Sequence, residues 1–325
     1  MIFRLVVSSA ALAFCAVSTH AQVPAGGAYP SKPIRLVVAS APGGGTDFNA
    51  RVIAPRVSES IGQALVIDNR GGAGGTVGSD IVAKSPPDGY TLLMVFVNFA
   101  IHPSLYPKLP YDPVKDFAPI TTLSATPLIL VVNPQVPAKS VKDLIALAKT
   151  PGSRLNYAAP GVGSLGHLAG ELFKSMTGVS MTHVPYKGGG PSIAALVGGE
   201  VHMYFSTIPA ALAQVKAGRL RALAVTSAKR AASGPDIPTI AESGVPGYDV
   251  NGWFGVFAPA KTPRVVVARL NAEFVEALKT AEVRERLTHE GLQPLGGTPE
   301  ALAMVLKNDV AKWGRVVREA GIKPQ

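Results

Sequence analysis

The sequence has little cysteine, few aromatic residues and no long apolar run outside its first residues. Its one cysteine, Cys15, lies in the N-terminal segment, and aromatic residues make up 6% of the chain. If that segment is removed on export, the remaining chain has no cysteine and depends on neither disulfides nor a reducing compartment. No later segment is apolar for long enough to cross a bilayer, so the sequence predicts an exported, soluble product.

The N-terminal segment itself has the pattern of a secretory signal. MIFRLVVSSAALAFCAVSTHAQ carries one positive charge at Arg4, a short apolar core, and Thr19-His20-Ala21 before Gln22. This order of charge, apolar core and small-residue cleavage site predicts a signal peptide over residues 1–21. The expected location of the mature chain is the periplasm.

Positive charge is in excess but dispersed. The chain has 31 Lys and Arg against 21 Asp and Glu, a formal charge of +10, with no basic run longer than two residues. With so few aromatic residues among them, these charges do not indicate nucleic acid. They favour solubility and mild attraction of anionic ligands.

Sites for metals and nucleotide cofactors are not indicated, and no cofactor is expected. The histidines at 102, 167, 183, 202 and 289 lack metal-ligand spacing. APGGGTD lacks the Gly-Lys-Ser/Thr ending of a P-loop. GGAGGTVG, at 71–78, imitates a dinucleotide fingerprint, but the required acidic residue after the next strand is missing.

Buried strands and helices alternate along the chain in two series. The first has apolar strands at 34–38, 64–67 and 91–97, and the second has strands at 128–132, 155–158, 181–184, 201–205 and 220–226. We expect 100–117 to wrap the surface. The alternation predicts an α/β protein of two hinged lobes, each a mostly parallel sheet covered by helices. We expect lobe 1 to comprise 30–125 plus 251–325, and lobe 2 to comprise 126–250, with Trp253 and Phe254 packed between them.

Two glycine-rich loops lead from strands into helices. In the first, Gly43, Gly44 and Gly45 let backbone approach a ligand closely, and Thr46 or Asp47 can cap the helix. In the second, Ser164 precedes a helix near His167. Since helix starts expose N–H groups and favour negative charge, the two loops predict an anion site, one half from each lobe.

Ser164 also allows a different interpretation. It lies in V-G-S-L-G, close to the G-x-S-x-G elbow of hydrolases, with His167 three residues later. Val162 occupies the first glycine position of that motif. A secreted serine hydrolase using Ser164 and His167 therefore stands as the alternative, although capping by Ser164 is favoured.

Many ordered motifs in the chain resemble one known family. YPSKPIRLVV, APGGGTD, DNRGGAGGTVG, PPDGYTLL, LPYDPVKDF, LNYAAPGVGSLGHLAGELFK, HVPYKGGGP, PTIAESGVPGY and WFGVFAPAKTP resemble the Bug family, the periplasmic solute receptors of tripartite tricarboxylate transporters. The resemblance covers the chain from about Tyr29 onward. It implies a type II periplasmic binding protein, a two-lobed flytrap that is not an enzyme.

The resemblance also implies a site and partners. A small organic acid would be held by two loops, with a third group of residues on the far side, and delivered to a cognate membrane permease. The first loop is Ser40, Ala41, Pro42, Gly43, Gly44, Gly45, Thr46 and Asp47; the second is Ala159, Gly161, Val162, Gly163, Ser164 and His167; the far side is Tyr186, Lys187, Gly188, Ser206 and Thr207.

The chain departs from the family pattern at a few positions, and the partner is open. Ala39 and Ser40 stand where a proline and an aromatic residue are usual, Val162 is apolar, and His202 replaces a common aspartate. The smaller side chains at 39 and 40 suggest a bulkier or more apolar acid. A sensor kinase could replace the permease as partner, and a monomer is expected because both lobes must face that partner.

Overall fold

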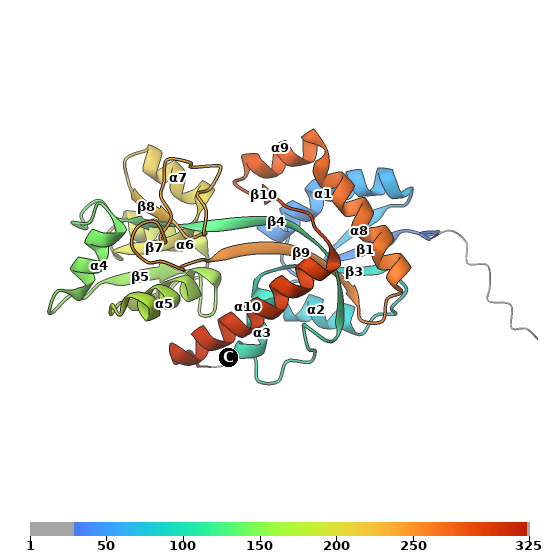
Figure 1. Cartoon of the computed structure of the whole chain (residues 1–325), viewed down its shortest axis with the longest axis horizontal. Helices are drawn as coiled ribbons and strands as arrows, with labels where there is room; N and C mark the ends of the chain where they lie inside the picture. The colour runs from blue at the N-terminus through green and yellow to red at the C-terminus, as the bar shows by residue number, and fades with distance from the viewer. Residues whose placement is uncertain (1–28, 324–325) are drawn as a thin grey trace, which may run out of the picture.

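The computed structural model describes residues 29–323. Within that range the chain folds into two α/β lobes placed side by side (Figure 1). The expected signal peptide, 1–21, lies outside the described residues. We call the lobe built on β1 the first lobe and the lobe built on β5 the second.

The first lobe begins as a parallel sheet of apolar strands. β1 (Ile34–Val38) lies between β2 (Leu65–Asn69) and β3 (Thr91–Phe96), parallel to both. β1 is almost fully buried because helices cover both faces of the sheet, as its unbroken run of branched residues requires. The helices of this lobe are α1 (Gly45–Ile61), α2 (Thr76–Ala83), α3 (Asn98–Leu105), α8 (Arg264–Lys279), α9 (Ala281–His289) and α10 (Pro299–Glu319), with the short turn η1 (Ala73–Gly75) before α2.

The second lobe repeats this plan. β5 (Asn156–Ala159) lies between β6 (Thr182–Pro185) and β7 (Met203–Thr207), parallel to both. β8 (Arg221–Val225) joins the same sheet through an antiparallel pairing with β4. The helices of this lobe are α4 (Val141–Lys149), α5 (Leu165–Thr177), α6 (Gly189–Val197) and α7 (Ile208–Lys216).

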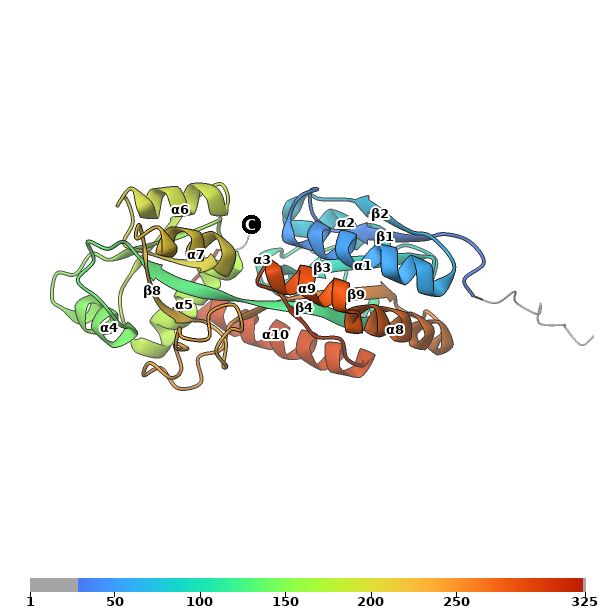
Figure 2. The same cartoon turned by 90° about the horizontal axis from the view of Figure 1, so that it is seen from above.

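Two long strands join the lobes. β4 (Phe117–Val132) pairs antiparallel with β9 (Asn251–Pro259) up to Pro127, and with β7 from Leu128 onward. The short β10 (Gln293–Pro294) also pairs with β4. Figure 2 shows β4 running from one lobe into the other. β4 therefore crosses from one lobe to the other and changes its pairing partner between Pro127 and Leu128.

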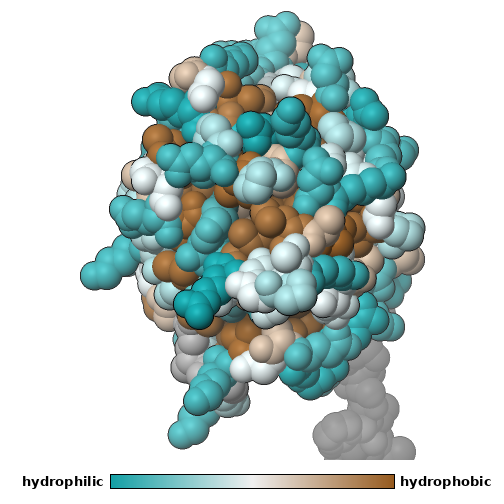
Figure 3. Space-filling model, turned by 90° about the vertical axis from the view of Figure 1, so that its left-hand side faces the viewer, coloured by the Kyte–Doolittle hydropathy of each residue, from teal (hydrophilic) through white to brown (hydrophobic). Residues whose placement is uncertain are grey.

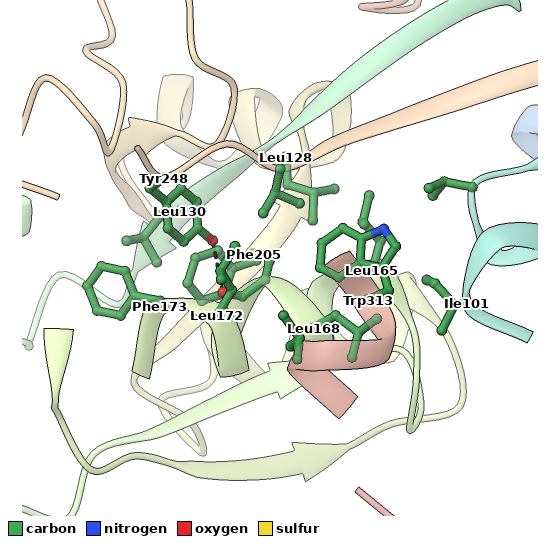
Figure 4. Close-up of a cluster of buried hydrophobic side chains, with 14 of the residues drawn as sticks. Ile101, Leu128, Leu130, Leu165, Leu168, Leu172, Phe173, Phe205, Tyr248 and Trp313 are labelled. Atoms are coloured by element: carbon green, nitrogen blue, oxygen red, sulfur yellow. Dashed lines mark hydrogen bonds between the residues drawn. The ribbon is translucent and has the colours of Figure 1, made fainter. Parts of the chain in front are cut away.

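A continuous apolar core lies beside this ribbon on the side that carries α10. Trp313 of α10 is fully buried and belongs to the same cluster as Ile101 of α3 and Leu165 of α5. Figure 4 shows Trp313 between Leu165 and Ile101, with Phe205 and Leu168 nearby. The C-terminal helix therefore packs on both lobes.

Two stretches differ from the sequence prediction. The strand expected at 128–132 begins earlier, at Phe117. Its first part was not predicted, because it contains proline at 119 and 127 and several polar residues. The expectation of a surface segment over 100–117 was wrong at its start, where α3 is buried through Phe99 and Ile101. The helix was not predicted because it is short and contains Pro103, a residue that usually ends a helix.

The end face of the second lobe is mostly hydrophilic (Figure 3). Figure 3 views the end of the second lobe, where apolar side chains gather near the middle of the face and hydrophilic ones surround them. Within residues 29–323, no helix combines the length and the apolar character that a membrane span requires.

Candidate functional site

A cavity of about 560 Å³ lies between the lobes. This volume is in the range of small-molecule sites. Most of its lining comes from the first lobe, with the start of α7 contributed by the second. The lining residues are Ala39, Ser40, Gly43, Gly44, Gly45, Thr46, Phe48, Gly74, Gly75, Val95, Phe96, Asn98, Phe99, His102, Thr126, Thr207, Pro209, Ala210, Phe254, Glu290 and Leu292.

The start of α1 forms the polar end of this cavity. Gly44 is the N-cap with φ −82° and ψ 170°, and no side chain caps the helix there. The N–H groups of Gly45, Thr46 and Asp47 therefore have no acceptor within the helix. Unsatisfied first-turn amides, together with the helix dipole, favour an anion at this point.

The glycines leave the start of α1 free of side chains on the cavity side. A Cβ on Gly44 would meet only the Ala41 carbonyl oxygen, at 3.7 Å, so space around Gly44 faces the cavity. A Cβ on Gly45 would lie 3.1 Å from Cζ of Phe254. Gly45 thus allows α1 to pack against the aromatic wall.

Asp47 points away from the cavity and holds the loop. Its buried carboxylate accepts hydrogen bonds from the Gly43 N–H at 2.8 Å, from Arg51 Nε at 2.8 Å and from Asn69 Nδ2 at 3.0 Å. These bonds, that of Arg51 first, lower the pKa of Asp47. The negative charge next to the helix start is therefore neutralised by its own partners and does not oppose an anionic ligand.

The second lobe contributes the start of α7. Thr207 is the N-cap, without a side-chain capping bond, and Thr207, Pro209 and Ala210 line the cavity. Pro209 also contacts the first lobe, since a Cβ on Gly291 would lie 3.3 Å from its Cγ. A second helix start therefore faces the cavity, and it belongs to α7.

Aromatic and aliphatic side chains form the wall between these helix starts. Phe96 and Phe254 pack with ring centroids 4.7 Å apart, and Phe48, Phe99 and Leu292 extend the same lining. Contact between this wall and the apolar part of a ligand would stabilise the complex, because it removes apolar surface from water.

His102 is a neutral part of the lining. Its Nδ1 lies 2.8 Å from the Tyr111 hydroxyl and its Nε2 lies 3.1 Å from the Gly74 carbonyl oxygen. Burial lowers the pKa of His102 to about 4. Its nitrogens are thus engaged by the protein, and the ring carries no charge at neutral pH.

The structure brings part of the expected site together at this cavity. Of the residues expected from the sequence, those that line it are Ser40, Gly43, Gly44, Gly45, Thr46 and Thr207. Ala41, Pro42 and Asp47 lie in the same loop and helix start. Val162 and His167 line a separate cavity of about 530 Å³.

The second loop lies beside the first lobe. Ser164 is the N-cap of α5, and its Oγ accepts from the His167 N–H at 3.3 Å, which confirms the expected cap. Gly163 meets α3, because a Cβ there would lie 2.2 Å from Cδ1 of Leu105. The Gly161 carbonyl accepts a hydrogen bond from Ser164, and Ala159 is buried at the end of β5.

The far-side group is dispersed. The Tyr186 hydroxyl pairs with Glu200 at 3.4 Å, Lys187 is exposed, and Gly188 is the N-cap of α6. Ser206 is 1% exposed within the second lobe. In the described part of the chain, Thr207 is the member of this group that reaches the cavity.

The hydrogen bonds of Ser164 and His167 do not make a nucleophile and base pair. The Ser164 hydroxyl donates to the Gly161 carbonyl at 2.8 Å, and His167 Nδ1 accepts from the Gly163 N–H at 3.0 Å. Burial lowers the pKa of His167 to about 3, which makes it a poor base at neutral pH. A serine hydrolase needs a direct bond between the two side chains, so the geometry does not favour that alternative.

The sequence did not reveal most of the wall. The wall residues Phe96, Pro209 and Phe254 come from three separate segments, and Glu290 and Leu292 come from a fourth. Only the tertiary fold brings these segments together. The sequence predicted lobe packing for Phe254, without a role at the site. Within residues 29–323, no cluster of three or more His, Cys, Asp or Glu residues could hold a metal ion.

The fold and cavity define a class of protein. Two α/β lobes joined by crossing strands, with a cavity between them lined by helix starts, make a binding protein of the periplasmic type. The chain belongs to the tripartite tricarboxylate transporter family receptors, whose family model matches residues 49–322. It is therefore a solute receptor, which is not an enzyme class.

Individual relatives agree with this assignment. Protein BugT of Bordetella pertussis is 39% identical over 91% of each chain. The structure of Rpa4515 with adipate, from R. palustris, is 41% identical with a TM-score of 0.78, covering 91% of this chain and 100% of that one. MatC (Rpa3494) from Rhodopseudomonas palustris with bound malate is 35% identical with a TM-score of 0.74, covering 89% and 100%.

Proposed function

We propose that this receptor binds a small organic acid by its carboxylate at the start of α1 and delivers it to a cognate membrane permease of the tripartite tricarboxylate type. The observation that carries the proposal is the open first turn of α1 in the cavity between the lobes, with the amides of Gly45, Thr46 and Asp47 free of capping side chains. Two similar proteins have structures with adipate and with malate, both carboxylates.

The expected affinity follows from the number of amides. Three charge-assisted hydrogen bonds of about 1.5–3 kcal/mol each give roughly 5–9 kcal/mol before ordering costs. Apolar contact with the phenylalanine wall adds to this, and lobe closure and lost ligand freedom subtract from it. A dissociation constant of about 1 μM is therefore expected.

The second loop completes the site when the lobes close. The start of α5, from Ser164 to His167, would approach the ligand together with Ala159, Gly161, Val162 and Gly163. Tyr186, Lys187, Gly188 and Ser206 would line the far side. Support comes from the contact of Gly163 with Leu105 on α3, which already places the loop against the first lobe.

The lobes that would close are 30–125 plus 251–325 and 126–250. The switch of β4 from β9 to β7 after Pro127 supports this division. The receptor would work as a monomer in the periplasm after removal of residues 1–21. A pull-down from membranes with the mature protein tests the permease as partner against a sensor kinase.

A calorimetric comparison of acids with their primary amides tests carboxylate binding. Each acid and its amide have nearly the same shape, but the amide is uncharged and has an NH2 donor in place of one carboxylate oxygen. We expect the acids to bind at about micromolar concentration and the amides at least tenfold more weakly, a factor worth about 1.4 kcal/mol. Equal binding of both members of each pair would contradict the proposal.

A further inference from the structure

The proposed ligand cavity contains one ionised side chain of its own. Among residues 29–323, no lysine or arginine lines the cavity, and Glu290 is the one carboxylate that does. His102 is neutral there, as described above. The charge environment of the ligand is therefore set by the α1 amides, by the start of α7 and by Glu290.

Glu290 is held near the second lobe. It is the C-cap of α9, and the next residue, Gly291, has φ +69°, which turns the chain back at this point. A Cβ on Gly291 would lie 3.3 Å from Pro209 Cγ and 3.9 Å from Ile208 Cβ, so this turn packs on the start of α7. α7 and α9 are the helices of the two lobes that face each other across the space between them (Figure 1, Figure 2).

The charge of Glu290 remains available to a ligand. The side chain is exposed, and its hydrogen-bond partner is the exposed His289, with 3.4 Å between His289 Nδ1 and Glu290 Oε1. A solvated contact of this length neutralises a carboxylate only weakly. By contrast, Asp47 has three close donors and lies outside the lining.

We propose that Glu290 selects against dicarboxylates, so that the ligand is an acid with one carboxylate, an apolar body and a neutral or cationic far end. The carboxylate occupies the α1 start, and the body covers Phe48, Phe96 and Phe254. A second carboxylate would face Glu290 with no lysine or arginine to compensate it within the described lining. Like charges brought together in this way exclude the wrong ligand.

This inference rests on the proposed binding of a carboxylate at the α1 start, and it adds which group is accepted at the far end of the ligand. The matched ligands are hexanoate, adipate and 6-aminohexanoate, which share one chain length and differ only in the far group. Calorimetry on the mature receptor should give weaker binding of adipate than of hexanoate, by about tenfold, and binding of 6-aminohexanoate at least as tight as that of hexanoate.

The variant Glu290→Gln separates charge from shape. We expect it to improve adipate binding about tenfold, to weaken 6-aminohexanoate by a similar factor and to leave hexanoate within about twofold. Glu285→Gln removes the same charge from an exposed position on α9 and should change none of the three. A Glu290→Gln protein with the same thermal midpoint as the native protein excludes a folding defect.

The outcomes distinguish the two proposals. If wild type binds adipate as tightly as hexanoate and Glu290→Gln changes neither, the selection rule is wrong while carboxylate binding stands. If Glu285→Gln has the same effect as Glu290→Gln, the effect is general electrostatics and the rule is again wrong. If none of the acids binds, both proposals fail.

Discussion

Substitution of Gly44 tests the role of the backbone at the α1 start. Gly44→Val should fold normally, because the backbone at Gly44 has φ −82° and ψ 170°, which a β-branched residue adopts readily. The nearest atom to an added Cβ is the Ala41 carbonyl oxygen at 3.7 Å, an ordinary contact. The new methyl groups would occupy the space in front of the Gly45 and Thr46 amides.

The expected loss follows from the blocked amides. If the introduced valine side chain displaces a carboxylate from two hydrogen bonds of about 1.5–3 kcal/mol each, binding weakens by roughly 3–6 kcal/mol. This is at least about a hundredfold in the dissociation constant. Gly44→Ala should have an intermediate effect because its side chain is smaller.

Calorimetry with the tightest-binding acid, together with thermal unfolding, measures both parts of this prediction. Gly190→Ala serves as the control, because Gly190 also lies in the first turn of a helix, α6, and an added Cβ there meets nothing within 4 Å. The control should bind as the native protein does. Native affinity in Gly44→Val, with an unchanged thermal midpoint, would refute the assignment of ligand to this helix start.

Other variants test the loops on which the site depends. Asp47→Asn should destabilise the protein by about 1–3 kcal/mol, because the charge-assisted bonds from Gly43 and its other donors are weakened. Since the pKa of Asp47 is lowered in the folded protein, the stabilisation is present above about pH 4 and is lost as the pH falls below it. Urea unfolding of the native protein and the variant should therefore show a smaller difference at pH 3 than at pH 7. Gly163→Ala should clash with Leu105 and lower the thermal midpoint, and in the double variant with Leu105→Ala the loss should be smaller than the sum of the two single losses; no change in Gly163→Ala would contradict the contact. Ser164→Ala should remove about 1 kcal/mol of helix capping in urea unfolding, and ester turnover by the native protein that this variant abolishes would revive the hydrolase interpretation.

Local sequence signals predicted much of the fold because they depend on neighbouring residues alone. The apolar run of β1 followed by glycines gave the strand, the loop and the helix start in the right order. The cap of α5 by Ser164 was also predictable from type and position. Both patterns are formed within a few residues, so tertiary contacts did not alter them.

Features that depend on distant pairing could not be predicted in this way. The first part of β4, from Phe117, is rich in threonine and contains proline, and it becomes a strand only because β9 pairs with it. The helix α3 carries Pro103 and is stabilised by burial of Phe99 in the core. In both cases tertiary packing outweighs a weak local preference.

In the cavity, too, the locally encoded loop was predicted and the residues brought together by tertiary contacts were not. The loop from Ser40 to Thr46 was expected to contact ligand from its glycines and helix start, and Ser40, Gly43, Gly44, Gly45 and Thr46 line the cavity. The aromatic wall and Glu290 were missed, since no short motif joins residues as far apart in sequence as Phe48 and Phe254. The sequence indicated one loop that lines the cavity but not the residues that form the rest of the lining.

The most direct measurement of the central claim is a crystal structure of the mature receptor with a bound acid. We expect the ligand carboxylate to lie in front of α1, with its oxygens about 2.7–2.9 Å from the backbone nitrogens of the first turn. The apolar body should contact Phe254. A carboxylate bound instead by lysine or arginine side chains, away from the α1 start, would contradict the account.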